Sequence, residues 1–322
     1  MINPDLEIII ITYNRKYYLE RTLKALGNSS FSDCKITVLD NCSTDDTPFV
    51  IDQAAQYLPY LENYRHRKNI GGDANILRAY EIATYPYLWL MGDDDIIFIE
   101  QADEVLRVCS DGKVDLINLI QAPFNVTQPT GLHSLQHYSR FYRYLFFQQS
   151  LITAVITKTS LITSSSLEIA YRQITSCFPH LVFTNEAIER NGLIYFLDKP
   201  LVSRDEPDIS TLGQIDGLNL VWFLRWCEAC RIITDSRVRS IALKDGFLVD
   251  ATIEYILTQI LEFRLLGNSF NFHSFLRVLS VLPKFSILAC ILISPIYIFP
   301  GFIVRLIDIS YRMRLFPPLS RL

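Results

Sequence analysis

The chain has 322 residues, of which 50% are hydrophobic and 20% are charged, and its mean hydropathy is +0.20. This composition excludes a disordered chain and exceeds the apolar content that an ordinary soluble enzyme needs. The net charge of −4 argues against a general nucleic-acid-binding protein.

Short apolar runs and segments with helical spacing alternate over the first hundred residues. In chain order, the predicted elements are a strand at Glu7–Thr12, a helix at Tyr17–Leu26, a strand at Lys35–Asp40, a helix at Pro48–Tyr57, a strand at Leu61–His66, a helix at Ala74–Ala83 and a strand at Tyr87–Met91. This alternation is typical of βαβ units, so we expect an α/β fold: a Rossmann-like, mostly parallel sheet with helices on both faces. Polar clusters follow these strands, at the edge where such sheets bind ligands.

The pattern is less regular beyond residue 110. Three more strands are predicted, at Lys113–Leu119, Leu151–Lys158 and Leu193–Leu197. From Leu218 to about Leu282 helical periodicity dominates. We therefore divide the chain into an α/β domain over residues 1–215, a helical region over 216–282 and a hydrophobic, amphipathic segment over 283–322.

The last of these parts has the composition of a membrane-associating segment. Residues 285–304 carry no charge, and this length is sufficient for a helix that crosses the bilayer core. Pro295 and Pro300 lie within it and basic residues flank both sides, so a single span and a kinked hairpin in one leaflet both remain open. A buried helix of a soluble domain is the third alternative. The tail at 303–315 resembles an interfacial amphipathic helix.

Three adjacent aspartates, Asp93, Asp94 and Asp95, follow the apolar strand that ends near Gly92. Adjacent carboxylates repel one another, so such a cluster requires a cation or a hydrogen-bond network that compensates the charge. Oxygen ligands suit Mg²⁺ or Mn²⁺, which often share the phosphates of a substrate. A metal at this position would stabilise a departing diphosphate. The alternative is an acidic turn that caps the next helix.

Other polar residues lie at the ends of the second and third predicted strands. Asp40 can accept hydrogen bonds from a base edge or a ribose hydroxyl, or it can belong to the cluster that caps the next helix. The Gly71–Gly72 pair allows a ligand to approach the backbone closely. Arg65 and Arg67 precede this pair, either facing phosphate or fully solvated.

Four motifs follow one another in the first hundred residues, and their order and spacing resemble those of family 2 glycosyltransferases with the GT-A fold. The motifs are ITYNR at 11–15, VLDNCSTD at 38–45, NIGG at 69–72 and LMGDDD at 90–95. The resemblance implies a nucleotide-diphospho-sugar donor and a divalent metal, Mn²⁺ or Mg²⁺. The nucleotide-sugar-binding residues that it implies are Thr12, Tyr13, Arg15, Asp40, Arg67, Gly71, Asp93 and Asp94. The metal ligands that it implies are Asp93 and Asp95.

The expected catalytic base departs from this family pattern. The family places an acidic pair upstream of a glycine that precedes a strand, and the corresponding position before Gly192 is Pro179–His180. His180 is the first candidate, since a neutral imidazole can accept the proton of an acceptor hydroxyl near pH 7. Glu186 is the second candidate and Asp205 the third, and His180 can instead be a structural histidine. The Pro-His pair also resembles transferases of deoxy and dideoxy sugars in O-antigen assembly, such as abequosyltransferases.

These observations predict an enzyme that moves a sugar from a nucleotide donor to a hydroxyl of a lipid-linked glycan. Inversion at the anomeric carbon follows if the family pattern of one-step displacement holds. The apolar carboxyl-terminal part suits a lipid-carried acceptor, because tethering to one surface raises the effective concentration. The amino terminus lacks the basic flank of a signal peptide, so we expect the protein at the cytoplasmic face of a bacterial plasma membrane, with no nucleic-acid partner.

Other functions have less support in the sequence. A catalytically degenerate, transferase-like scaffold of a polysaccharide assembly complex is the main alternative, and the intact aspartate cluster argues against it. A nucleotidylyltransferase would need a glycine-rich phosphate loop after the first strand, and a dinucleotide-dependent dehydrogenase would need GxGxxG. Thr12–Arg15 offers neither.

Overall fold

The computed structural model describes residues 2–119, 129–136, 149–203, 225–226, 228–234 and 239. The chain divides into two compact units, and the helices and strands given below belong to the first, Met1–Glu206 with Arg231–Asp245. Asp205, the segment at 283–322 and most of 216–282 lie outside the described residues. None of the helices in the described residues has the length and apolar content that a bilayer crossing requires.

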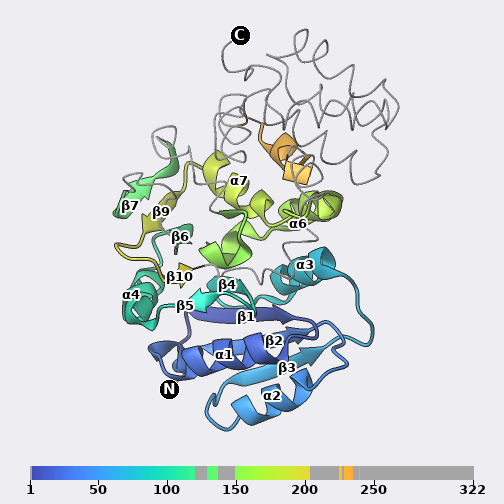
Figure 1. Ribbon diagram of the computed structural model, residues 1–322. Coiled ribbons are helices and arrows are strands. Elements are labelled where there is room, and N and C mark those ends of the chain that lie inside the picture. Colours follow the sequence, from blue (N-terminus) through green and yellow to red (C-terminus); the bar gives the residue numbers. More distant parts are fainter. Residues whose placement is uncertain are drawn as a thin grey trace, which may run out of the picture. The chain divides into compact units, whose positions relative to one another are not determined.

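An eight-stranded sheet organises the first unit, in the order β3-β2-β1-β4-β8-β6-β9-β7 (Figure 1). Its strands are β1 (Leu6–Thr12), β2 (Lys35–Asp40), β3 (Leu61–Arg65), β4 (Tyr87–Gly92), β6 (Leu116–Asn118), β7 (Gly131–Ser134), β8 (Val155–Lys158) and β9 (Leu193–Phe196). The first four strands are parallel, as is the pair of β6 and β9. β8 and β7 run antiparallel to their neighbours. The predicted mostly parallel sheet is therefore confirmed.

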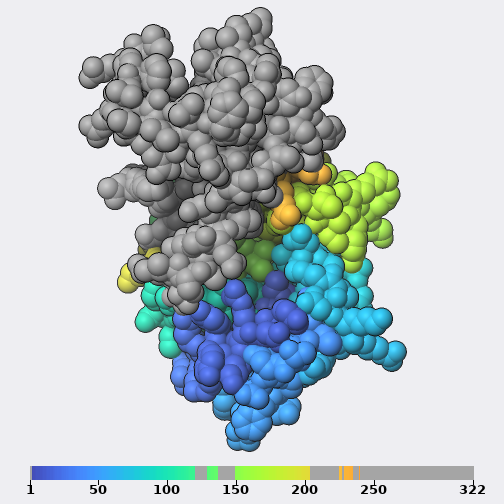
Figure 2. Space-filling view, turned by 45° about the vertical axis from the view of Figure 1, so that its right-hand side comes forward, coloured from blue at the N-terminus to red at the C-terminus, as the bar shows by residue number. Residues whose placement is uncertain are grey.

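Helices cover both faces of this sheet, because successive side chains of a buried strand point to opposite sides. The helices are α1 (Lys16–Gly27), α2 (Thr47–Ala54), α3 (Gly72–Ile82), α4 (Ala102–Asp111), α6 (Ser164–Arg172) and α7 (Leu181–Glu189). Ile8 and Ile10 of β1 belong to one core together with residues of α1, α2 and α4. Ile9 belongs to a second core with residues of α3, α6 and α7. Figure 2 shows α3 and α6 side by side on this second face, where they pack together.

The parallel register brings the polar ends of the first four strands to one edge. Thr12 of β1 pairs with Asp40 of β2, and Asp40 pairs with Arg65 of β3. On the other side of β1, Ile11 pairs with Gly92 of β4. The residues that follow Gly92 are therefore close neighbours of Thr12.

Two predicted strands are shorter than the sequence pattern indicates. The strand predicted at Leu151–Lys158 begins only at Val155, because Ile152–Ala154 forms a 3₁₀ turn whose Thr153 side chain bonds to the end of β4. The segment predicted at Lys113–Leu119 enters the sheet at Leu116, after Gly112 (φ 63°) has turned the chain at the end of α4.

A small antiparallel pair was not predicted. β5 (Ile96–Ile97) directly follows the three aspartates Asp93–Asp95, which we call the acidic triplet, and pairs with β10 (Val202–Ser203). Strands of two residues are too short to show the alternation of polar and apolar residues by which strands are recognised.

The position of Gly192 leaves no room for a side chain. A Cβ atom there would lie 2.6 Å from Asp115 Oδ2 and 2.9 Å from the Ala187 carbonyl oxygen. The Asp115 carboxylate is itself held by the Leu193 N–H, at 2.8 Å. We expect Gly192→Ala to lower the free energy of unfolding by about 1–3 kcal/mol, measured by urea titration.

Gly72→Ala is the matched control for this prediction. Gly72 opens α3, and no atom lies within 4 Å of where its Cβ would be. The control should stay within about 1 kcal/mol of the wild-type protein. Equal stability of both variants would contradict the close packing around Gly192.

Candidate functional site

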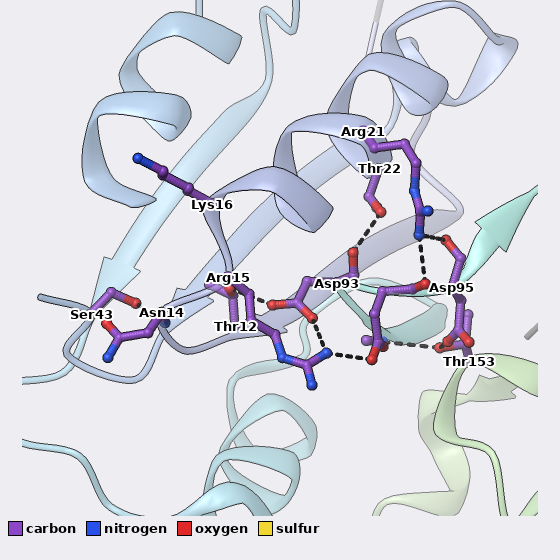
Figure 3. Close-up of polar contacts among 12 residues, drawn as sticks. Thr12, Asn14, Arg15, Lys16, Arg21, Thr22, Ser43, Asp93, Asp95 and Thr153 are labelled. Atoms are coloured by element: carbon purple, nitrogen blue, oxygen red, sulfur yellow. Dashed lines mark hydrogen bonds and ion pairs between the residues drawn. The ribbon is translucent and has the colours of Figure 1, made fainter. Parts of the chain in front are cut away.

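The acidic triplet after β4 is held in place by β1 and α1. Asp93 and Asp95 are buried, with 4% and 6% of their surface exposed, whereas the Asp94 side chain is half exposed. Thr12 Oγ1 donates a hydrogen bond to Asp93 Oδ2 at 2.6 Å, and Thr22 Oγ1 donates to the Asp93 backbone oxygen at 2.9 Å (Figure 3). Two carboxylates are thus kept in the interior at the edge of the sheet where ligands bind.

Two arginines bring positive charge to the triplet. The Arg15 guanidinium forms an ion pair with the Asp94 carboxylate and lies 3.5 Å from Asp93 Oδ1. Arg21 of α1 donates from Nη2 to the backbone oxygens of Asp94, at 2.6 Å, and Asp95, at 3.5 Å (Figure 3). These contacts compensate the repulsion that three adjacent carboxylates would otherwise produce.

Burial changes the proton affinity of the site. It raises the pKa of Asp93 to about 6, against the opposing effects of the Thr12 hydrogen bond and the Arg15 charge. Burial acts to lower the pKa of Arg15, but the charges of Asp94 and Asp93 outweigh it and the pKa is raised. An ionised Asp93 is therefore short of compensating charge, and a cation bound beside it would be stabilised.

Thr153 holds the triplet from the opposite side. Its hydroxyl accepts the Gly92 N–H at 2.9 Å and donates to Asp95 Oδ2 at 2.5 Å. Its backbone oxygen accepts the Trp89 Nε1–H at 3.0 Å. Thr153 is fully buried, and the sequence pattern does not single it out because it stands within what reads as an ordinary strand. The sequence shows a threonine among apolar residues at this position and gives no other sign of its contacts.

The oxygen atoms of Asp93 and Asp95 fit a hard divalent cation. In the part of the chain that the structure describes, no three His, Cys, Asp or Glu side chains gather as a metal-binding group. Mg²⁺ is commonly held by one or two carboxylates and completes its coordination with water and substrate phosphates. Two buried carboxylates are therefore a sufficient protein contribution to a metal that is shared with a phosphate ligand.

Asp40, at the end of β2, carries a buried oxygen that accepts no hydrogen bond from the described residues. Its Oδ1 accepts the Ser43 N–H at 2.9 Å, while Arg65 Nε lies 3.6 Å from Oδ2. The residue is fully buried. A buried carboxylate oxygen without a donor is unfavourable, so Oδ2 is suited to accept an N–H or O–H group of a ligand.

The loop at residues 69–71 is shaped by Asn41, which follows Asp40. Asn41 Nδ2 donates to Asn69 Oδ1 at 2.9 Å and to the Gly71 carbonyl at 3.3 Å, and its Oδ1 accepts the Ile70 N–H at 2.9 Å. Gly71 has a φ of 89°, which favours glycine, and no atom lies within 4 Å of its Cβ position. The loop therefore has open space beside its backbone.

The structure brings most of the predicted nucleotide-sugar residues together. Of these predicted residues, Thr12 and Arg15 both contact Asp93, and Arg15 also contacts Asp94. Asp40 lies beside Thr12 in the sheet register, and Gly71 is tied to the residue after Asp40. Tyr13 and Arg67 are exposed at the surface, and Arg67 makes no hydrogen bond or ion pair with the described residues.

The two described candidates for the catalytic base lie on or beside α7. His180 is 2% exposed; its Nε2–H donates to the Gln149 carbonyl at 2.9 Å, and its Nδ1 is buried. Burial lowers the pKa of His180 to about 4. Glu186 is half-buried and forms an ion pair with Arg190 at 2.7 Å. Neither assignment is tested by these contacts, and both stay predictions.

Comparisons with known proteins agree with this geometry. The family model described as Glycosyl transferase family 2 matches residues 7–168. The abequosyltransferase RfbV of Salmonella typhimurium is 34% identical over 110 residues, which are 33% of either chain. The GalNAc(5)-diNAcBac-PP-undecaprenol beta-1,3-glucosyltransferase of Campylobacter jejuni is 26% identical over 112 residues, 34% of this chain and 36% of the relative. The matched segment thus spans about a third of the length of these curated relatives.

Solved structures share the fold of this chain. TarS 1–349 of S. aureus has a TM-score of 0.55 at 19% identity, covering 96% of this chain and 91% of that one. The mannosyltransferase PcManGT of Pyrobaculum calidifontis, in complex with GDP-Man and Mn²⁺, has a TM-score of 0.53 at 13% identity, covering 90% and 85%. These identities show the fold alone, whereas the family model covers half of the 322 residues, including all four motifs. The chain therefore belongs to glycosyltransferase family 2.

Proposed function

We propose that this chain is an enzyme that transfers a sugar from a nucleotide-diphospho-sugar to a hydroxyl of a lipid-linked glycan. The observation that carries the proposal is the pair of buried carboxylates, Asp93 and Asp95, beside Thr12 at the ligand-binding edge of the sheet. Two structural neighbours were solved with ligands of this class, TarS with UDP-GlcNAc and PcManGT with GDP-Man and Mn²⁺.

The nucleoside half of the donor would bind at the end of β2. The buried Asp40 Oδ2 would accept a hydrogen bond from the base or the ribose, and Tyr13 and Arg67 would close over the nucleotide from the surface. The open space beside Gly71 allows the donor to contact the backbone. The donor diphosphate would then lie toward the acidic triplet at the end of β4.

The acidic triplet would stabilise the departing diphosphate through a bound cation. Asp93 and Asp95 would hold Mn²⁺ or Mg²⁺, which supplies positive charge to the phosphate oxygens as the sugar leaves. Arg15 is partly exposed and carries a second positive charge at the same place. Thr12 and Thr153 fix the carboxylates through hydrogen bonds, so little reorganisation is needed when the donor binds.

A base on or near α7 would take the proton of the acceptor hydroxyl; the sequence names His180 as the first candidate and Glu186 as the second. Attack of this hydroxyl on the anomeric carbon in one step would invert its configuration. A deoxy or dideoxy hexose is the proposed sugar, supported by the 34% identity to an abequosyltransferase. The lipid-linked acceptor is supported by the undecaprenol-linked substrate in the name of the C. jejuni relative.

Replacement of Asp95 by Asn tests the enzymatic function. We expect Mn²⁺-dependent transfer, or slow hydrolysis of the donor, to fall by about 100-fold or more, because the amide removes the charge that holds the cation. Asp111→Asn on the exposed end of α4 is the matched control and should keep full activity. Donor turnover that is the same in both variants would contradict the role of Asp95, whereas turnover that is absent from the wild-type protein would favour the scaffold alternative.

Replacement of Asp40 by Asn tests the nucleoside site. A charge-assisted hydrogen bond to the ligand contributes about 1.5–3 kcal/mol, so affinity for the preferred nucleoside diphosphate should fall about 10- to 100-fold. Calorimetry with UDP, GDP, CDP and dTDP measures this and identifies the base. Asp46→Asn is the control, since its exposed carboxylate pairs only with Lys16 among the described residues. An unchanged affinity in Asp40→Asn would place the nucleoside elsewhere.

We also propose that residues 283–322 attach the protein to the cytoplasmic face of a bacterial plasma membrane. Their apolar composition is the support for this localisation. Deletion of residues 283–322 should move the protein from the membrane fraction to the soluble fraction in a sedimentation assay. Nucleotide binding by the shortened chain controls for folding, and a full-length chain that is already soluble would overturn the proposed localisation.

A further inference from the structure

Two residues at the start of α7 hold Gln149 in the interior. The His180 Nε2–H donates to the Gln149 backbone oxygen at 2.9 Å, and Thr184 Oγ1 donates to Gln149 Oε1 at 2.5 Å. All three residues are at least 98% buried. Buried hydrogen bonds of this kind are costly to break, so the position of Gln149 is fixed by α7.

Thr153 lies four residues further along the same segment and holds Asp95. Its hydroxyl accepts from Gly92 and donates to the Asp95 carboxylate, so both its hydrogen-bonding directions are determined. The Ala154 N–H donates to the Leu151 carbonyl at 3.0 Å, which closes the 3₁₀ turn between the two ends. The segment at residues 149–153 is therefore a short link between α7 and the acidic triplet, with buried ends at Gln149 and Thr153 and partly buried residues between them.

We infer that His180 is a positioning residue that, together with Thr184, sets the place of Asp95 through this link. The inference rests on the proposed function, since Asp95 is the proposed metal ligand. It gives His180 a role other than that of catalytic base. The contact to Gln149 needs a fixed N–H donor and no proton transfer.

The surroundings of the imidazole support this role. Its Nε2 is committed to the Gln149 carbonyl, and its Nδ1 is buried, so neither nitrogen is open to an acceptor hydroxyl in this conformation. A general base must come within hydrogen-bond distance of the proton that it removes. Glu186, which is half-buried, then becomes the leading candidate for the base.

The test compares variants that keep or remove the donor at position 180. His180→Gln retains a side-chain N–H at about the place of Nε2, whereas His180→Phe removes it. Residues that support a metal ligand typically contribute 10- to 100-fold to metal affinity. We expect His180→Phe and Thr153→Val each to weaken Mn²⁺ binding to the full-length protein by about tenfold, measured by electron paramagnetic resonance. His180→Gln should bind Mn²⁺ about as well as the wild type and keep most of its transfer activity.

Hydrogen exchange provides a readout that needs neither metal nor activity. The Gly92 amide donates to Thr153, so its exchange should become faster in both His180→Phe and Thr153→Val. The double variant of His180→Phe and Thr153→Val should have the same Mn²⁺ affinity and Gly92 exchange rate as Thr153→Val alone, because both changes break the same link. Thr157→Val, at an equally buried threonine of β8, is the matched control and should leave Mn²⁺ affinity and Gly92 exchange unchanged.

The outcomes separate this inference from the proposed function. Loss of transfer in both His180 variants, with unchanged Mn²⁺ affinity and Gly92 exchange, would make His180 the base and overturn the inference. Weakened Mn²⁺ binding and faster exchange only in Thr153→Val would show that α7 is not coupled to Asp95, and would also overturn it. If the wild-type protein transfers no sugar but the variants show the expected exchange, the proposed function fails and the link stands.

Discussion

The hydrogen bond from Thr12 to Asp93 joins the ends of β1 and β4, and the rest of the site is built around it. Burial of a carboxylate disfavours its charged form, and the raised pKa of Asp93 expresses this. The surrounding groups reduce the cost of burying this charge without removing it, since Thr12 donates to one oxygen of Asp93 and Arg15 approaches the other. The protein thus keeps a site whose electrostatics are completed only when further positive charge arrives.

The sequence predicts which residues gather at the edge of the sheet because these residues follow the ends of parallel strands. Such ends meet at one edge of the sheet whatever the lengths of the loops, so Thr12, Asp40 and Asp93 could be grouped from their order alone. Thr153 is different. It lies 58 residues downstream of Asp95, and its contact depends on a 3₁₀ turn inside what reads as a continuous strand. No local pattern of residue types specifies that turn.

The sequence pattern also does not determine whether His180 is buried. A histidine after a proline can be exposed in a cleft or packed in a core, and the choice depends on Gln149, which is 31 residues from His180 in the sequence and meets it only in the folded chain. The family match ends at residue 168, before α7 begins. The motifs that the sequence groups lie at residues 11–95, whereas Thr153 and the residues that face α7 must be placed by their contacts.

One edge of the sheet has a consequence for the behaviour of the protein in the cell. β3 is a short outer strand whose residues are mostly exposed, and it carries Glu62 and Arg65 among its five residues. Charged side chains on a short edge strand discourage a second chain from adding to the sheet. The strand that brings Arg65 beside Asp40 thereby also protects the molecule from self-association through open backbone groups, a hazard that grows where many copies crowd together.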